Sequence, residues 1–464
     1  MSDASAVPAL SADLHTFAEA SLAKWHVPGA AIGILKDGEM RFAAFGRSRL
    51  DVPYPTTHDT LFRVASITKP FTATLAMTLV NDGLLDLDRP IAEYLPGIAL
   101  SDADDDWQDA ITMRHLLSHT AGIDCELPVN LAVLGNGDEA LADAVGFYGG
   151  LHQWAKPGQI MSYGNTGFWL AGHVIATILG TTFEEAMRAR VFRPLGLQRT
   201  VFTAAEAIVF PTALGHEPRS HEDPTHELIR SYAYPRARTP SGGVISTVED
   251  LLTFAAWHLG ERPELPISLS AALREAMREP QVRLRGADSE TWGIGWDLAA
   301  TSDGTTLIGH GGSYGGFQTQ LTLVPERGFA FAILTNSARG GMANAEIEQW
   351  VLQHELGLAA DDPTPVTLPA AELARFAGTY RQPLATYDIA ATADGLAVTV
   401  RSRGLAGEDE PAAPVIRMSP IGERDFYVTR GGSKGTRADF VPDPETGELN
   451  RVRIGLRIAE RVDG

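Results

Sequence analysis

The order of strand and helix patterns along the chain constrains its fold most strongly. Residues 30–46 form two apolar segments around Asp37-Gly38, a dipeptide that favours a tight hairpin turn. Residues 306–336 contain three short apolar or alternating segments, separated by Gly and Pro, that predict adjacent antiparallel strands. Helix patterns stand between these two regions. We therefore expect an α+β fold in which both ends of the segment contribute to one antiparallel sheet.

Apolar residues at helical spacing predict the remaining elements of this segment. Ser246 with Glu249 forms a capping-box pattern, which predicts a helix start ahead of the apolar run that follows. The helices flank the sheet and form a mainly helical subdomain in the middle of the segment. Besides the helix after Ser246, we expect helices over residues 10–25, 66–85, 111–123, 166–196 and 343–356.

The composition changes near residue 361, where Pro and Asp become frequent, and a different pattern follows. Apolar and polar residues then alternate in short segments, as at Arg451, Val452, Arg453 and Ile454. Alternation of this kind predicts strands, and over roughly ninety residues it favours a small all-β domain, either a barrel or a sandwich. The expected organisation is a catalytic domain over 1–360, a linker over 361–371 and an all-β domain over 372–464.

The formal charge of -20 argues against two classes of partner. Nucleic acids and anionic membrane surfaces bind basic patches, which this charge balance does not favour. No run approaches the roughly 18 apolar residues that a membrane span needs, and the N-terminus lacks the basic start and apolar stretch of a secretory signal. We therefore expect a cytoplasmic protein with neither nucleic acid nor membrane as a partner.

Metal and disulfide chemistry have little support in the sequence. The single cysteine, Cys125, allows no intrachain disulfide and no thiolate cluster. His115 and His119 are four apart, but no carboxylate accompanies them in the H-E-x-x-H manner, so capping or core packing is the favoured interpretation. The segments 221–227 (HEDPTHE) and 102–106, which is rich in Asp, are interpreted as polar loops. We expect no metal and no organic cofactor.

Ser66 and Lys69 form an S-x-x-K tetrapeptide that is followed at once by Pro70. A serine hydroxyl becomes a good nucleophile when a neighbouring base accepts its proton, and positions three apart share one face of a helix. Pro70 fits the first turn of a helix, where backbone N–H groups have no intrahelical acceptor. Lys69 acts as a base only if burial or a nearby cation lowers its pKa. The tetrapeptide is therefore either a nucleophile with its proton acceptor or a serine cap beside a solvated lysine.

Two further motifs favour the catalytic interpretation. They are Tyr163-Gly164-Asn165 and, on an expected strand, His310-Gly311-Gly312. Together with S-x-x-K they resemble the penicillin-recognising serine hydrolases, which include class C β-lactamases, low-molecular-mass penicillin-binding proteins, D-aminopeptidases and family VIII carboxylesterases. The resemblance covers about residues 10–357 and implies a serine hydrolase that works through an acyl-enzyme.

The resemblance also implies how the nucleophile is activated. Ser66 is expected to attack the carbonyl carbon, and Lys69 and Tyr163 to share the proton relay, with either of the two as the acylation base. A tyrosine near two cations is expected to be partly ionised near neutral pH. The backbone N–H groups of Ser66 and Ser313 are expected to bind the oxyanion.

The substrate-binding residues follow from the same resemblance. Asn165 is expected to bond both Lys69 and the substrate amide, and His310 to line the opposite wall. Gly311 and Gly312 keep the strand bare, which allows the substrate to approach its backbone.

His310 departs from the pattern of many β-lactamases, which have Lys-Thr-Gly at this place. A lysine there helps to hold a substrate carboxylate, whereas a histidine is largely neutral near pH 7. This disfavours β-lactamase activity and suits D-aminopeptidase-like or esterase relatives. We rank D-amino-acid peptidase or amidase activity slightly above carboxylesterase activity, with β-lactam hydrolysis third. The expected substrate is a small molecule or a short peptide. Whether the protein forms a homo-oligomer stays open. Three roles of the all-β domain also stay open: covering the catalytic cleft, mediating oligomerisation or buttressing the core.

Two alternatives to this mechanism stay open. Gly311-Gly312-Ser313-Tyr314-Gly315 matches the G-x-S-x-G nucleophile elbow of α/β-hydrolases. That fold needs a histidine downstream, and His354 falls in an expected helix rather than in a loop. The second alternative is a sensor that is acylated by a penicillin, or binds a ligand, without turnover.

Overall fold

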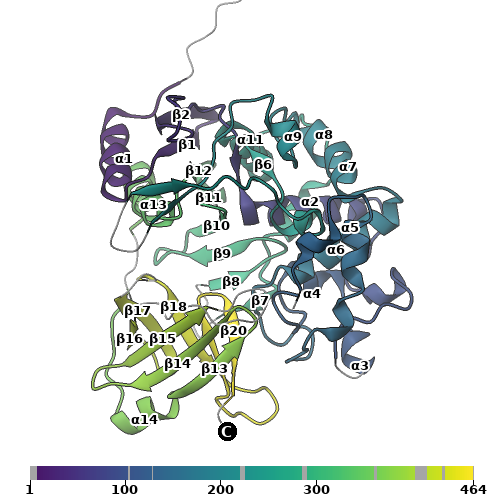
Figure 1. The fold of residues 1–464 in the computed structure, drawn as a ribbon, viewed down its shortest axis with the longest axis vertical. Coiled ribbons are helices and arrows are strands. Elements are labelled where there is room, and N and C mark those ends of the chain that lie inside the picture. The colour runs from purple at the N-terminus through teal and green to yellow at the C-terminus, as the bar shows by residue number, and fades with distance from the viewer. Residues whose placement is uncertain are drawn as a thin grey trace, which may run out of the picture.

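An eight-stranded antiparallel sheet in the order β2-β1-β12-β11-β10-β9-β8-β7 forms the centre of the first part of the chain (Figure 1). β1 pairs with β12, from Ala30 opposite Thr335 to Leu35 opposite Ala330. The expectation that both ends of this segment build one sheet is therefore confirmed. The computed structural model describes residues 8–102, 105–127, 129–219, 225–284, 290–359, 363–402, 415–430 and 434–462. The strands of the sheet are Gly29–Lys36 (β1), Glu39–Gly46 (β2), Val282–Arg283 (β7), Glu290–Trp292 (β8), Asp297–Ala300 (β9), Thr306–Tyr314 (β10), Phe317–Val324 (β11) and Phe329–Thr335 (β12).

The turn between β1 and β2 has the predicted geometry. Asp37 and Gly38 have φ values of 54° and 74°. Two successive positive φ angles are the signature of the type I′ turn, whose twist matches the twist of the strands that it joins.

Helices cover both faces of the sheet, and the alternation of side chains along each strand separates two cores. On one face, Ile32 and Ile34 of β1 pack with residues of α1 and α13 such as Leu14 and Ile347. On the other face, Leu35 belongs to the large core that includes α2 and α11. These helices are Ala12–Lys24 (α1), Thr68–Asn81 (α2), Val248–Leu259 (α11) and Gly340–Leu356 (α13).

The helical subdomain is built from shorter helices than the sequence pattern predicts. The expected helix over 166–196 is broken at Gly180, which has φ 62°, and a new helix starts at the cap Thr182. Among the described residues, no single helix is long and apolar enough to cross a membrane, although Thr166–Leu179 and Phe183–Leu195 meet those limits as a pair bent by 79°. The other helices are Asp105–Gln108 (α3), Met113–Leu117 (α4), Ala140–Val145 (α5), Thr166–Leu179 (α6), Phe183–Met187 (α7), Arg193–Leu195 (α8), Ala204–Ala207 (α9), Thr239–Gly242 (α10) and Ala271–Ala276 (α12).

The predicted cap at Ser246 is wrong by one position. Thr247 caps α11, and its side chain accepts a hydrogen bond from the backbone N–H of Asp250. Ser246 instead belongs to the short strand β6, and its hydroxyl is 2.8 Å from that of Thr200. Two two-stranded sheets complete this part of the chain: Phe62–Arg63 (β3) with Ile245–Ser246 (β6), and His216–Pro218 (β4) with His226–Leu228 (β5).

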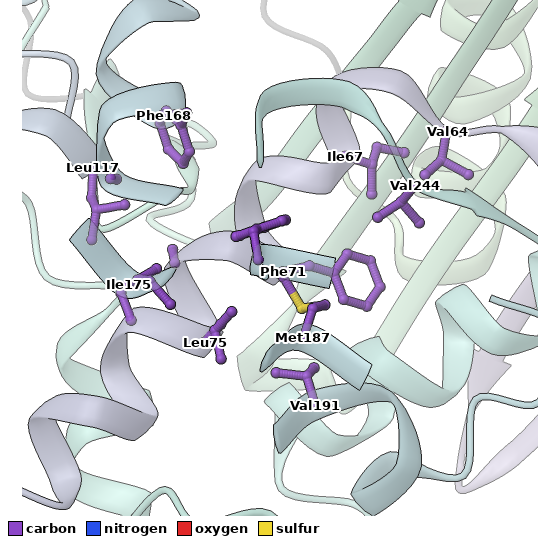
Figure 2. Close-up of a cluster of buried hydrophobic side chains, with 14 of the residues drawn as sticks. Val64, Ile67, Phe71, Leu75, Leu117, Phe168, Ile175, Met187, Val191 and Val244 are labelled. Carbon is purple, nitrogen blue, oxygen red and sulfur yellow. The ribbon is translucent and has the colours of Figure 1, made fainter. Parts of the chain in front are cut away.

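α2, the helix that follows directly from Ser66 and contains Lys69, runs through the large core. Figure 2 shows Phe71 and Leu75 of this helix with Met187 and Val191 packed beside them. All twelve residues from Thr68 to Leu79 are buried. A helix surrounded by core on every side has little freedom to move, which favours a fixed position for the residues at its start.

The C-terminal part is a closed barrel of eight antiparallel strands, so of the two expected all-β architectures the barrel is correct. Its core contains Tyr380, Phe426 and Phe440, together with Leu373 and Phe376 from the segment that precedes the first strand. Its elements are Ala370–Arg375 (α14), Gly378–Gln382 (β13), Ala385–Ala391 (β14), Leu396–Ser402 (β15), Ile416–Pro420 (β16), Asp425–Arg430 (β17), Arg437–Val441 (β18), Arg451–Ile454 (β19) and Arg457–Arg461 (β20).

The barrel packs beside β7 and β8 at the edge of the sheet (Figure 1), and arginines fill the contact. Arg453 pairs with Asp439 and donates to the carbonyl of Met161 at 3.0 Å. Arg451 donates to the carbonyl of Trp154 at 2.9 Å. Both arginines are therefore buried, because the polar face of β19 meets the first part of the chain instead of water.

Candidate active site

Ser66 lies in a 3₁₀ turn, Ala65–Ile67, that leads directly into α2. Ala65 has a φ of 47°, in the left-handed region that residues with a Cβ rarely occupy. Backbone strain of this kind is found preferentially at functional sites, where the surrounding structure holds it in place. The turn directs the side chain of Ser66 into a cavity.

Lys69 lies in the first turn of α2 and is completely buried. Its Nζ is 3.2 Å from Ser66 Oγ, 2.8 Å from Asn165 Oδ1 and 2.9 Å from the carbonyl oxygen of Ser241. Burial, aided by the charge of Arg457, holds the pKa of Lys69 well below its usual value. The interpretation of Lys69 as a solvated side chain is therefore wrong.

Tyr163 faces the same two side chains. Its hydroxyl lies close to Ser66, and Lys69 Nζ lies 4.8 Å from the centre of its ring. Burial raises the pKa of Tyr163 above its ordinary value, against the smaller opposing effects of Ser66 and Arg457. The expectation of partial ionisation near neutral pH is therefore wrong, because desolvation outweighs the nearby cations.

Asn165 directs the two ends of its amide to two partners. Its Oδ1 accepts from Lys69, and its Nδ2 donates to the carboxylate of Glu126. Glu126 is 6% exposed and also pairs with Arg238 at 3.4 Å. The sequence analysis missed Glu126, because it lies in a loop that carries no motif.

His310 lies on β10 and forms part of the wall of the cavity, as expected. Its Nδ1 is 2.6 Å from the carbonyl oxygen of Gly311. Burial, together with the charge of Lys69, lowers the pKa of His310 to about 3. The imidazole is therefore neutral at pH 7, in agreement with the sequence-based expectation.

The two glycines after His310 leave the strand bare. A Cβ at Gly312 would lie 2.2 Å from the carbonyl oxygen of Val64, so no larger residue fits there. β9 pairs with β10 only as far as Gly309, opposite Asp297. The stretch of β10 from His310 onward therefore presents an unpaired edge, which is the kind of surface that an extended substrate backbone can join.

These residues surround one cavity of about 440 Å³. The structure thus brings together Ser66, Tyr163, Asn165 and His310 from separate parts of the chain, with Lys69 directly behind them. The lining residues are Ser66, Tyr163, Asn165, Trp292, Asp297, His310, Gly311, Gly312, Ser313, Gln318, Thr319, Gln320, Gly341, Asn344, Ala345, Glu348, Leu456 and Arg457.

Ser313 lines this cavity but does not form a nucleophile elbow. It lies within β10, which continues through a tight turn into β11 instead of turning sharply into a helix. Its hydroxyl accepts a hydrogen bond from Gln318 at 2.8 Å. His354, the histidine that the elbow alternative needed, stacks on Trp350 within α13. The geometry therefore contradicts the elbow alternative.

The barrel supplies two residues that the sequence analysis missed, Leu456 and Arg457. They lie at the β19–β20 hairpin, where the carbonyl oxygen of Leu456 accepts from the backbone N–H of Tyr163 at 2.8 Å. The guanidinium of Arg457 is 5.1 Å from the centre of the Tyr163 ring. No carboxylate among the described residues forms an ion pair with it, and its buried Nε has no partner.

The other sequence candidates have structural roles. His115 forms a capping box with Thr112, and His119 packs on Tyr163 and accepts from the backbone N–H of Gly164 at 3.2 Å. Within the described ranges, no group of three or more His, Cys, Asp or Glu residues is arranged to hold a metal ion. Asp102 accepts from Gln153, whereas residues 103–104 and 221–224, and the side chain of residue 105, lie outside the described residues.

Known proteins resemble both the sequence and the fold. Penicillin-binding protein 4 of Amycolatopsis lactamdurans is 34% identical over 368 residues, which cover 77% of this chain and 94% of that protein. The crystal structure of SurE with D-Leu is 26% identical with a TM-score of 0.74, and the match covers 97% of this chain and 99% of that chain. The structure of a D-stereospecific amidohydrolase from Streptomyces sp. is 26% identical with a TM-score of 0.61, over 75% of this chain and 99% of that chain.

The family model described as Beta-lactamase matches residues 14–356, which include the S-x-x-K tetrapeptide, Tyr163, Asn165 and His310. This range is more than half of the chain and ends with α13. The fold agrees, with an antiparallel sheet, flanking helices and a C-terminal barrel that the SurE match also spans. The chain therefore belongs to the β-lactamase family, whose members are serine hydrolases that act on amides and esters.

Proposed function

We propose that this protein hydrolyses amides or peptides of D-amino acids through an acyl-enzyme on Ser66. The observation that carries the proposal is the environment of Lys69, whose Nζ lies 3.2 Å from Ser66 Oγ at a buried position. Such a lysine has a lowered pKa and is suited to accept the proton of the attacking hydroxyl.

The hydrogen-bonding groups around Lys69 Nζ support Lys69 as the base. A neutral lysine amine has two N–H groups and one lone pair. The oxygens of Asn165 and Ser241 take the two N–H groups, at 2.8 and 2.9 Å. The lone pair is then left for the O–H of Ser66, which transfers its proton as Oγ attacks the substrate carbonyl.

Tyr163 is suited to the second proton transfer. Burial keeps its hydroxyl protonated, and that hydroxyl lies close to Ser66. When the tetrahedral intermediate collapses, the Tyr163 O–H donates its proton to the leaving nitrogen, and the ammonium of Lys69 returns a proton to the Tyr163 oxygen. Water then attacks the acyl-enzyme by the same steps in reverse. The backbone N–H groups of Ser66 and Ser313 are the oxyanion donors in this mechanism.

The preference for D-amino-acid substrates has two supports. One is similarity to SurE, whose structure contains D-Leu, and to a D-stereospecific amidohydrolase. The other is Arg457, a cation in the cavity that compensates for the neutral His310. A guanidinium without an acidic partner is a natural site for a substrate carboxylate. We therefore favour short peptides that end in a D-residue with a free carboxylate.

Hydrolysis of a small substrate panel tests this proposal. The panel contains D-alanyl-D-alanine peptides, D-alanine p-nitroanilide and its L-enantiomer, p-nitrophenyl butyrate and nitrocefin, each with wild type, Ser66→Ala and Ser313→Ala. We expect the D-substrates to be turned over by wild type and Ser313→Ala, and Ser66→Ala to lose roughly 10⁴-fold or more in kcat/KM. Preference for the L-enantiomer, or full activity of Ser66→Ala, contradicts the proposal. Acylation by a penicillin probe without turnover of any substrate favours the sensor alternative.

A further inference from the structure

The cavity beside Ser66 continues past the edge of β10 to the opposite face of the sheet. Successive residues of a strand point to opposite faces. Gly312 faces Val64 and the Ser66 turn, whereas Gly311 faces Gln320, whose Oε1 would be 3.1 Å from a Cβ at that position. The residues beyond Gly311 on this second face come from α13 and include Glu348. Substrate side chains that alternate along the β10 edge therefore reach two different surfaces.

Glu348 and Asn344 supply hydrogen-bond acceptors on the second surface. Glu348 accepts from the hydroxyl of Thr322 and from Gln320 Nε2 at 3.5 Å, but it forms no ion pair with any described residue. Asn344, one helical turn earlier, is 5% exposed and lines the same cavity. Its buried Oδ1 has no hydrogen-bond partner, which is unfavourable unless a ligand supplies the donor.

The charges around the cavity are separated. Arg457 is the one lysine or arginine among the residues that line it, and it comes from the barrel side. Glu348 and Asp297 are the lining carboxylates, from α13 and β9. Burial raises the pKa of Glu348, an effect that a cation brought beside it would oppose.

We infer that Glu348 and Asn344 form a subsite for an ammonium or guanidinium group of the substrate. The inference rests on the proposed function, because the subsite belongs to the cavity that contains Ser66. A substrate backbone along the β10 edge places one side chain over Gly311, on the face toward Gln320 and α13. The cation of that side chain, or a free α-amine of the same residue, then donates to Glu348 and to the unpaired oxygen of Asn344. Arg457 holds the oppositely charged end of the same molecule.

Matched substrates test this subsite. N-acetyl-D-lysine p-nitroanilide carries a side-chain cation, N-acetyl-D-norleucine p-nitroanilide lacks it, and D-norleucine p-nitroanilide carries only the α-amine. We expect wild type to favour one of the two cationic substrates by about tenfold in kcat/KM over the neutral one. Glu348→Gln should remove this preference by lowering kcat/KM for the cationic substrate, and Asn344→Asp should increase it.

Glu346→Gln is the matched control, because Glu346 lies on the same helix but pairs with Lys24 of α1. Equal rates for all three substrates in wild type, or an unchanged preference in Glu348→Gln, overturn the subsite while the proposed function stands. If wild type hydrolyses none of them, the proposed function fails instead. The subsite is then tested by calorimetric binding of N-acetyl-D-lysinamide and N-acetyl-D-norleucinamide to Ser66→Ala, where equal affinities overturn it and tighter binding of the lysinamide supports it.

Discussion

The guanidinium of Arg457 lies 5.1 Å from the centre of the Tyr163 ring, and this contact joins the C-terminal barrel to the candidate active site. The neighbouring hydrogen bond from Tyr163 N–H to the Leu456 carbonyl fixes the hairpin at that position. The barrel therefore contributes directly to the cavity. Of the roles left open for it, covering the cleft is the one that this contact favours.

Replacing Arg457 with Gln should weaken binding of substrates that end in a carboxylate. The variant keeps hydrogen-bonding capacity but removes the cation, and a charge-assisted pair with a carboxylate contributes roughly 1.5–3 kcal/mol. We expect KM for a D-alanyl-D-alanine peptide to rise by about tenfold or more, and KM for the same peptide with a C-terminal amide to change little. An equal rise for both peptides would indicate a structural role for Arg457.

The same variant should change the pH dependence of acylation. Lys69 acts as a base only when deprotonated, so kcat/KM rises with pH through the pKa of Lys69. Burial and Arg457 both lower that pKa, which keeps the amine active near neutral pH. Removal of the Arg457 cation should raise the pKa of Lys69 and move the acidic limb of the profile to higher pH. A profile measured on the amide-ended peptide separates this effect from carboxylate binding, and an unmoved limb would contradict it.

Glu126 should act as a positioning residue for Asn165. Its carboxylate accepts from Asn165 Nδ2 and thereby fixes the amide so that Oδ1 faces Lys69. Glu126→Ala should allow the amide to rotate, which removes an acceptor from Lys69, and should lower kcat by about tenfold or more with little effect on KM.

Glu126→Gln provides the conservative comparison. It retains a side-chain oxygen for Asn165 but loses the negative charge. Because that charge raises the pKa of Lys69, its loss should lower the pKa. We therefore expect Glu126→Gln to recover most of the kcat lost in Glu126→Ala and to move the acidic limb of the pH profile to lower pH. Equal loss in both variants would show that the charge, rather than the orientation of Asn165, is what matters.

The sequence predicted the elements that depend on local patterns. The Asp37-Gly38 turn, the strands that carry His310 and the S-x-x-K helix start all follow from short-range spacing, and each is present. The same reasoning failed where packing decides the outcome. Thr247 rather than Ser246 caps α11, because Ser246 pairs within β6 and bonds Thr200.

The site residues show the same division. Four site residues belong to motifs: Ser66, Lys69, Tyr163 and His310. Their proximity in the folded chain could therefore be expected from the resemblance to a known family. Glu126 and Arg457 belong to no motif, and only the folded chain brings them within reach of Asn165 and Tyr163. Ionisation also depends on burial, which explains why the expected partial ionisation of Tyr163 was wrong.

Arg453 should be essential for the contact between the barrel and the catalytic part. It is 3% exposed and pairs with Asp439, and it also donates to the carbonyls of Met161 and Leu284. Arg453→Met breaks the buried ion pair between Arg453 and Asp439, a change that costs about 3–5 kcal/mol. We expect a clear loss of stability in urea unfolding, together with the rise in KM for carboxylate-ended peptides that Arg457→Gln shows, because the hairpin loses its support.

Two comparison variants make this prediction specific. Arg381 is an exposed arginine on β13, so Arg381→Met removes the same charge from the barrel surface and should change stability little. The double variant Arg453→Met/Asp439→Leu replaces the buried pair with apolar groups and should recover much of the lost stability, since neither charge of the broken pair then stays buried. It should not recover the contacts to the Met161 and Leu284 carbonyls, so KM for the carboxylate-ended peptide should stay high. If Arg453→Met and Arg381→Met were equally stable, Arg453 would not be essential for the contact between the barrel and the catalytic part.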